Sequence, residues 1–87
     1  MSDYMDSDEN ISHTIKGTIG KIARFDQSEI SDDTLIRDEL GVDSLMGIEI
    51  LAKIEKYYDI SINESSLLDV ERVGEFVSLI ESKLDKK

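Results

Sequence analysis

Residues 43–59 read DSLMGIEILAKIEKYYD and contain the clearest helical pattern in the sequence. Its apolar side chains recur every three or four residues, which is the period of an α-helix. Aspartate and serine are favoured at a helix start, so Asp43 and Ser44 mark the beginning of this helix. A stripe suited to the core of a small helical bundle contains Met46, Ile50, Leu51, Ile54 and Tyr57 or Tyr58.

A second apolar stripe lies on roughly the opposite side of the same predicted helix and consists of Leu45, Ile48 and Ala52. A helix on the outside of a small bundle buries one face, so we expect this stripe to be partly exposed. An exposed apolar strip with a charged rim indicates a docking surface. The alternative is that Leu45 and Ile48 pack beneath a loop.

Two further segments have helical periodicity. Residues 11–25 carry Ile11, Ile15, Ile19, Ile22 and Phe25 on one face, and residues 70–84 carry Val73, Phe76, Val77, Ile80 and Leu84. Residues 63–68 are long enough for a short helix only. The predicted fold class is therefore all-α, a small four-helix bundle of three longer helices and a short third one.

The connection over residues 26–43 is predicted to be a long ordered loop between the first two helices. The apolar residues of this connection do not recur with a sustained helical period. However, four of them are spaced so that they can anchor the loop to a core, namely Ile30, Leu35, Ile36 and Leu40. We expect residues 1–10 to form a disordered acidic leader, residues 11–84 the folded domain, and residues 85–87 a C-terminal tail.

Composition excludes several classes of function. The 87 residues fit one domain, and ten Lys and Arg against 20 Asp and Glu give a net charge of −10. This charge disfavours nucleic acid and anionic membranes and favours partners with basic patches. No apolar stretch reaches membrane length, so we expect a cytoplasmic protein without membrane insertion. We also expect it to be a monomer.

The residues needed for an enzyme do not assemble in the sequence. His13 is the only histidine, and Asp43 is adjacent to Ser44 in a stretch without the Gly-x-Ser-x-Gly pattern of a nucleophilic serine. There is no cysteine, and the acidic residues lack the spacing of a metal site. Ser44 remains as a serine at a helix start, which suits either a phosphate ester or a simple N-cap.

The segment Leu40-Gly41-Val42-Asp43-Ser44-Leu45 resembles the Leu-Gly-x-Asp-Ser-Leu signature of acyl carrier proteins. The resemblance extends over residues 11–84. It implies that Ser44, flanked by Asp43 and Leu45 in the cofactor-binding motif, receives 4'-phosphopantetheine covalently from coenzyme A. Acyl groups would then be held as thioesters on the arm, and the protein itself would not be an enzyme.

The resemblance also implies partners, namely a phosphopantetheinyl transferase (holo-acyl carrier protein synthase) and acyl-loading and acyl-processing enzymes with basic docking patches. Together with the exposed stripe, it identifies the docking residues as Leu45, Met46, Ile48, Glu49, Ala52 and Glu55. Lys53 and Lys56 interrupt a helix that is more uniformly acidic in many fatty-acid carriers, which indicates a specialised carrier.

Two alternatives stay open beside a carrier for fatty-acid, polyketide or related lipid biosynthesis. An aminoacyl or peptidyl carrier, including D-alanyl carriers, shares the fold and the arm. Asp43 favours an acyl carrier, because peptidyl carriers more often have histidine at this position. The other alternative is an unmodified helical adaptor that binds partners through Leu45, Ile48 and Ala52.

Overall fold

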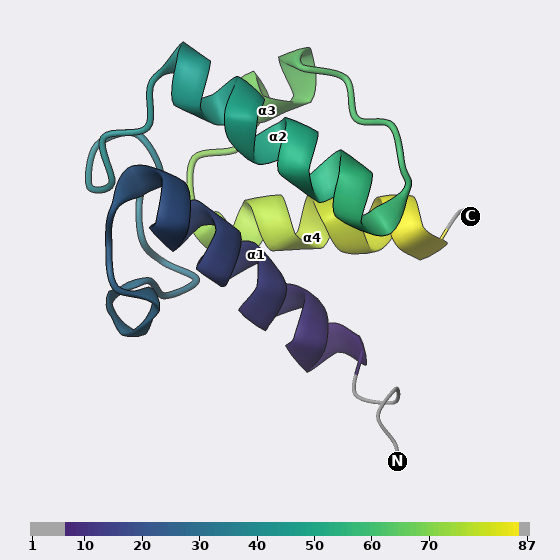
Figure 1. Cartoon of the computed structure of the whole chain (residues 1–87), viewed down its shortest axis with the longest axis horizontal. Helices are drawn as coiled ribbons and strands as arrows, with labels where there is room; N and C mark the ends of the chain where they lie inside the picture. The colour runs from purple at the N-terminus through teal and green to yellow at the C-terminus, as the bar shows by residue number, and fades with distance from the viewer. Residues whose placement is uncertain (1–6, 86–87) are drawn as a thin grey trace.

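The computed structural model describes residues 7–85, and within this range the chain forms four α-helices and no β-strand (Figure 1). The predicted all-α fold class, with three longer helices and a short third one, is confirmed. In order along the chain the elements are α1 (Ser7–Ala23), a 3-10 turn η1 (Gln27–Glu29), α2 (Ser44–Tyr58), α3 (Ser65–Asp69) and α4 (Val73–Asp85).

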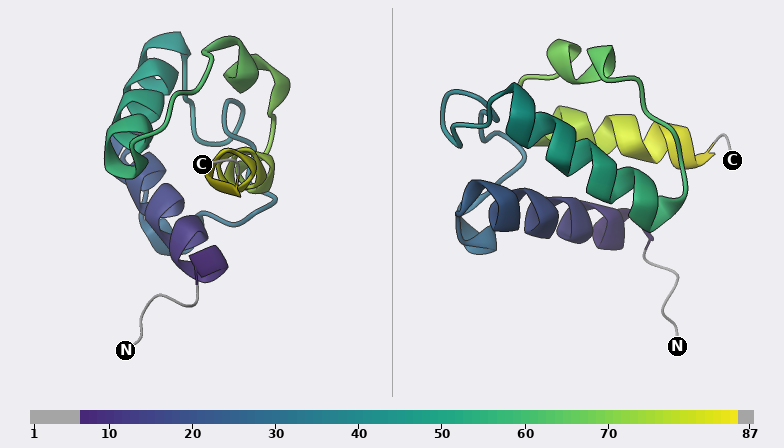
Figure 2. Two further views of the ribbon diagram at one scale, coloured as in Figure 1. Left: turned by 90° about the vertical axis from the view of Figure 1, so that its right-hand side faces the viewer. Right: turned by 45° about the horizontal axis from the view of Figure 1, so that its top comes forward.

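Of the three longer helices, α1 packs against both α2 and α4. The short α3 lies on the side of the bundle away from α1 (Figure 2). The long loop crosses the end of the bundle where α1 ends and where α2 and α4 begin. This topology places the start of α2, with Ser44, between the long loop and α3.

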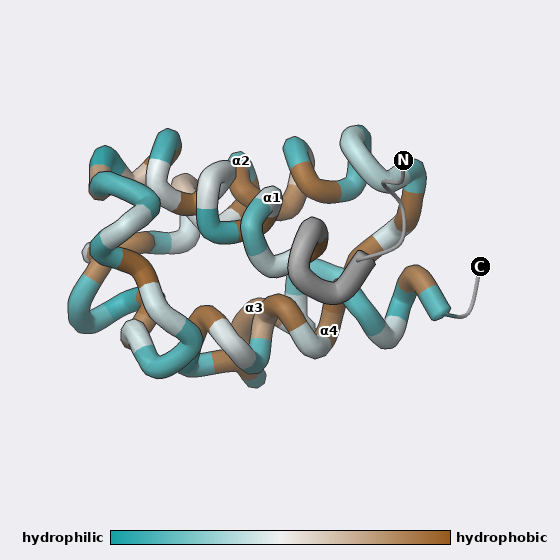
Figure 3. Tube along the Cα trace, turned by 90° about the horizontal axis from the view of Figure 1, so that it is seen from below, coloured by the Kyte–Doolittle hydropathy of each residue, from teal (hydrophilic) through white to brown (hydrophobic). Residues whose placement is uncertain are grey.

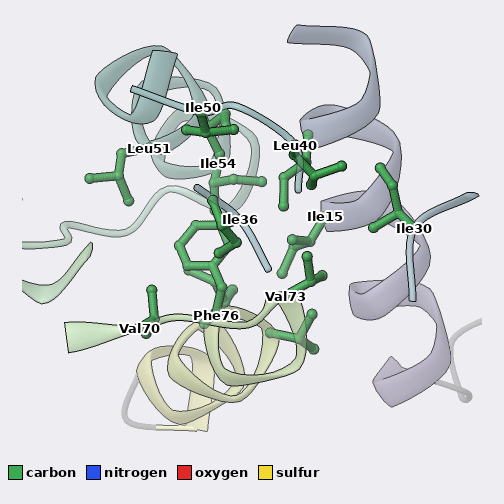
Figure 4. Close-up of a cluster of buried hydrophobic side chains, with 14 of the residues drawn as sticks. Ile15, Ile30, Ile36, Leu40, Ile50, Leu51, Ile54, Val70, Val73 and Phe76 are labelled. Carbon is green, nitrogen blue, oxygen red and sulfur yellow. The ribbon is translucent and has the colours of Figure 1, made fainter. Parts of the chain in front are cut away.

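The core receives side chains from the three longer helices and from the long loop. Ile15, Ile54 and Phe76 are among its most deeply buried members (Figure 4). Apolar and polar residues alternate along the helices, as expected when each helix buries one face (Figure 3). Burial of one such side chain stabilises the fold by about 1.5–3 kcal/mol.

The core stripe predicted for α2 is largely confirmed. Ile50, Leu51 and Ile54 are buried, and Met46 is half-buried against the core. Of the two tyrosines, Tyr58 packs against the core, whereas Tyr57 is 69% exposed.

The long loop is held to the bundle by buried side chains and by its backbone. Ile30, Ile36 and Leu40 are buried as predicted, whereas Leu35, the fourth predicted anchor, is only half-buried. The carbonyl groups of Asp32 and Thr34 accept hydrogen bonds from the backbone N–H groups of Gly74 and Val73, at 2.9 and 3.0 Å. These bonds satisfy donors at the start of α4 that lack a partner within the helix.

Several predicted helix boundaries differ from the structure. Helix α1 ends at Ala23 instead of residue 25, and α3 covers Ser65–Asp69 instead of residues 63–68. Helix α1 begins at Ser7, so four residues assigned to the leader are helical, and α4 runs from Val73 to Asp85 instead of over residues 70–84. Apolar periodicity locates only those turns that contribute to the core, and residues 7–10 contain no apolar residue. The rest of the predicted leader, residues 1–6, and residues 86–87 of the tail lie outside the described range.

Candidate functional site

The start of α2 is capped by Asp43. The Asp43 backbone is extended, and its carboxylate accepts a hydrogen bond of 2.9 Å from the backbone N–H of Met46. Ser44 is the first helical residue and is exposed. Because Asp43 supplies the cap, the Ser44 hydroxyl makes no hydrogen bond to any other residue in the described part of the chain.

The segment before the helix alternates between buried and exposed residues. Leu40 and Val42 are buried, and the Val42 N–H donates to the Ile36 carbonyl at 3.2 Å. Between them, Gly41 has a φ of +69°, a left-handed conformation that glycine adopts at little cost. The buried residues anchor the segment, and Asp43 and Ser44 are presented to solvent.

A groove of about 380 Å³ opens beside Ser44 between α2 and α3. Most of its exposed lining is apolar, and the lining residues are Arg37, Asp43, Ser44, Ile48, Leu51, Glu64, Ser65, Leu67 and Leu68. Gly47 brings α3 close to α2 here, since a Cβ atom at this position would lie 2.6 Å from Leu67 Cδ2. A larger residue at position 47 would therefore require the Leu67 side chain, which lines the groove, to shift.

The predicted docking residues fall into two groups. Leu45 is 70% and Ile48 44% exposed, which excludes burial of these two residues beneath the loop. Glu49 and Ala52 are also exposed.

The other two predicted docking residues have contacts inside the domain. Met46 packs partly against the core, and the Glu55 carboxylate accepts a hydrogen bond of 2.6 Å from the Ile62 N–H. The sequence prediction missed Leu68, which is 74% exposed on α3 and lines the groove. Its neighbour Leu67 packs against the core, and five helical residues are too few for periodicity to separate the two.

A second groove, also of about 380 Å³, lies between α1 and α2 and has a mainly polar lining. It contains His13, whose Nδ1 accepts a hydrogen bond of 3.0 Å from Gln27 Nε2, together with Lys21 and Lys53. Neither Asp43 nor Ser44 lines it. Among residues with described side chains, no group of His, Asp and Glu could hold a metal ion.

The pKa values of Tyr58 and Glu75 are shifted by their surroundings in the folded domain. Burial raises the pKa of Tyr58, and a hydrogen bond with Thr14 partly opposes this increase. Hydrogen bonds from the backbone N–H groups of Glu71 and Arg72 lower the pKa of Glu75, in the first turn of α4. Neither residue lines the groove beside Ser44.

Comparison with known proteins identifies the family. The family model described as "Phosphopantetheine attachment site" matches residues 13–80. The chain is also 30% identical over 80 residues to the acyl carrier protein of Thermotoga maritima, and the match covers 92% of this chain and 99% of that protein. The chain belongs to the acyl carrier protein family.

Two further similarities are to parts of larger proteins. The chain is 36% identical over 70 residues to the non-reducing polyketide synthase dbaI of Emericella nidulans, a match to 80% of this chain but 3% of the synthase. The HMG-ACPI domain from the CurA module of Lyngbya majuscula superposes with a TM-score of 0.78 at 21% identity, covering 99% of this chain and 89% of that domain. At this identity the superposition supports the fold alone.

The family determines the cofactor and the general role. Acyl carrier proteins are not enzymes, and they hold 4'-phosphopantetheine covalently. The residues at the start of α2 fit this group, because an exposed hydroxyl without an internal partner adjoins an apolar groove.

None of the helices within residues 7–85 is long and apolar enough to cross a membrane.

Proposed function

We propose that Ser44 carries the 4'-phosphopantetheine arm and that the protein carries acyl groups as thioesters on the arm, for fatty-acid, polyketide or related lipid biosynthesis. The observation that carries this proposal is the exposed Ser44 hydroxyl, which Asp43 relieves of the capping role. The chain has no cysteine, so the thiol for a thioester must come from the arm.

Attachment requires one substitution at phosphorus. Ser44 Oγ attacks the phosphorus next to the pantetheine part of coenzyme A, and the bond to the adenosine bisphosphate leaving group breaks. The hydroxyl proton leaves, and a phosphodiester on Ser44 results. The backbone N–H groups at the start of α2 favour an anion at this position. The transferase supplies the catalytic groups.

The docking surface that we propose for the transferase and for acyl-processing enzymes consists of Leu45, Ile48, Glu49, Ala52 and Leu68. Three of these residues are apolar and more than 40% exposed, namely Leu45, Ile48 and Leu68. The net charge of −10 favours association with basic patches on partners. Met46 and Glu55 act through the position of α2, because both have contacts within the domain.

Mass spectrometry tests the attachment site. The protein is incubated with coenzyme A and a broad-specificity phosphopantetheinyl transferase, and the intact masses of wild type, Ser44→Ala and Ser65→Ala are compared. We expect one phosphopantetheinyl adduct on wild type and on Ser65→Ala, a matched control because Ser65 lines the same groove. No adduct is expected on Ser44→Ala. An unmodified wild type, or a modified Ser44→Ala, contradicts the proposal.

The exposed stripe of Leu45 and Ile48 also suits an unmodified adaptor. An adaptor would show no adduct in the same experiment. Loading the modified protein with acyl or aminoacyl groups in parallel distinguishes an acyl carrier from an aminoacyl or peptidyl carrier.

A further inference from the structure

Arg37 is the one basic residue among residues 26–43, which contain seven acidic residues. It lies in the long loop, and its side chain lines the groove beside Ser44. The other charged residues of that groove are Asp43 and Glu64, both acidic. Among the residues that the structure describes, Arg37 is therefore the only cationic one in the groove, and it is far from α3 in sequence.

The contacts of Arg37 within the protein are weak. Its Nη1 and Nη2 atoms donate to the carbonyl oxygens of Leu67 and Val70 at 3.5 and 3.3 Å, which is longer than the usual 2.7–3.2 Å. No carboxylate of the residues with described side chains forms an ion pair with it. A guanidinium group has five N–H donors, so most of them are available to a ligand.

We propose that Arg37 is a positioning residue that binds the phosphodiester of the arm and holds the arm at the groove between α2 and α3. This inference rests on the proposed attachment at Ser44. The phosphorus would be bonded to Ser44 Oγ, and its two non-bridging oxygens would carry the negative charge into a groove that the acidic Asp43 also lines. A planar guanidinium group matches two phosphate oxygens, and charge-assisted hydrogen bonds of this kind are stronger than neutral ones.

A purely structural role for Arg37 predicts a different outcome. Its bonds to Leu67 and Val70 connect the long loop to the end of α3 whether or not an arm is attached. Their loss would destabilise the unmodified (apo) and modified (holo) proteins equally. A bond to the phosphodiester stabilises only the holo protein, so the difference in melting temperature between holo and apo forms separates the two roles.

The experiment measures this difference for wild type, Arg37→Gln, Arg37→Lys and Arg72→Gln. Arg72 is the matched control, because it donates to the Asp33 carbonyl in the same loop at 3.1 Å and does not line the groove. We expect Arg37→Gln to lose about 2–4 °C of the holo-minus-apo difference. Arg37→Lys should retain part of it and Arg72→Gln all of it.

Phosphorus NMR of the holo proteins gives a second readout at the phosphodiester itself. The phosphorus chemical shift should change in Arg37→Gln and stay at the wild-type value in Arg72→Gln. Equal holo-minus-apo differences and equal phosphorus shifts in wild type and Arg37→Gln would overturn the inference and leave the attachment at Ser44 intact. Failure of every variant, wild type included, to form the holo protein would overturn both.

Discussion

Helix α2 has two apolar faces that differ in what they contact. Ile50, Leu51 and Ile54 are at most 2% exposed, whereas Leu45 and Ile48 on the other face are 70% and 44% exposed. All five are leucine or isoleucine residues of one helix, so their exposed fractions differ because they face different directions around the helix axis. Burial explains the first face. The second adds little to the core, and we propose that it contacts partner proteins.

The largest difference between the two faces should appear in stability. Ile54→Ala removes a side chain that is 0% exposed, and we expect the free energy of unfolding to fall by about 2–5 kcal/mol. Ile48→Ala should cost less than about 1 kcal/mol, because this side chain is partly solvated before the change. Urea unfolding of both variants measures the contrast, and equal losses would show that the second face also supports the core.

A smaller difference in stability is expected between substitutions of the two residues at the start of α2. Asp43→Ala removes the cap on the Met46 N–H, and we expect a loss of about 0.5–2 kcal/mol in the free energy of unfolding. Ser44→Ala removes a hydroxyl without an internal partner and should change stability by at most about 0.5 kcal/mol. Thermal unfolding measures both variants. A larger loss of stability in Ser44→Ala than in Asp43→Ala would show that Ser44 caps the helix.

The smallest change in stability should accompany a clear change in docking. Leu45→Ala should alter the free energy of unfolding by at most about 0.5 kcal/mol but lower the transferase kcat/KM by about 5–30-fold, as expected for an apolar residue at an interface. Tyr57→Ala is the matched control, because Tyr57 is 69% exposed near the other end of α2. Equal effects of the two substitutions on the transferase kcat/KM would show that Leu45 does not belong to the docking surface.

Local sequence determined most of what could be predicted about the fold. The period of apolar residues identified the core face of α2, and the loop anchors Ile30, Ile36 and Leu40 are buried as expected. The start of α1 was misplaced because residues 7–10 contain no apolar residue. The start of α4 was misplaced because of a long-range contact. A helix was predicted from residue 70, but the Glu71 carbonyl accepts a hydrogen bond from the Ile36 N–H in the long loop, and α4 begins only at Val73.

The candidate site was predictable in part for the same reason. The signature around Ser44 is local, and so is the exposed stripe that begins at Leu45. The groove, by contrast, joins Arg37 of the long loop to Leu67 and Leu68 of α3, and no periodicity relates these positions. The hydrogen bond from the Ile62 N–H to Glu55 is also not predictable from the sequence pattern, although it engages one oxygen of that carboxylate.

The contact between Gly47 and Leu67 has a consequence for how the groove can evolve. Helix α3 has five residues and no side-chain hydrogen bond at its N-cap, so its stability depends on neighbouring elements more than on its own backbone. One wall of the groove is therefore positioned by side-chain volume at two sites, neither of which is Ser44. We therefore expect substitutions at positions 47 and 67 to change the width of the groove without replacing any residue of the segment that presents Ser44.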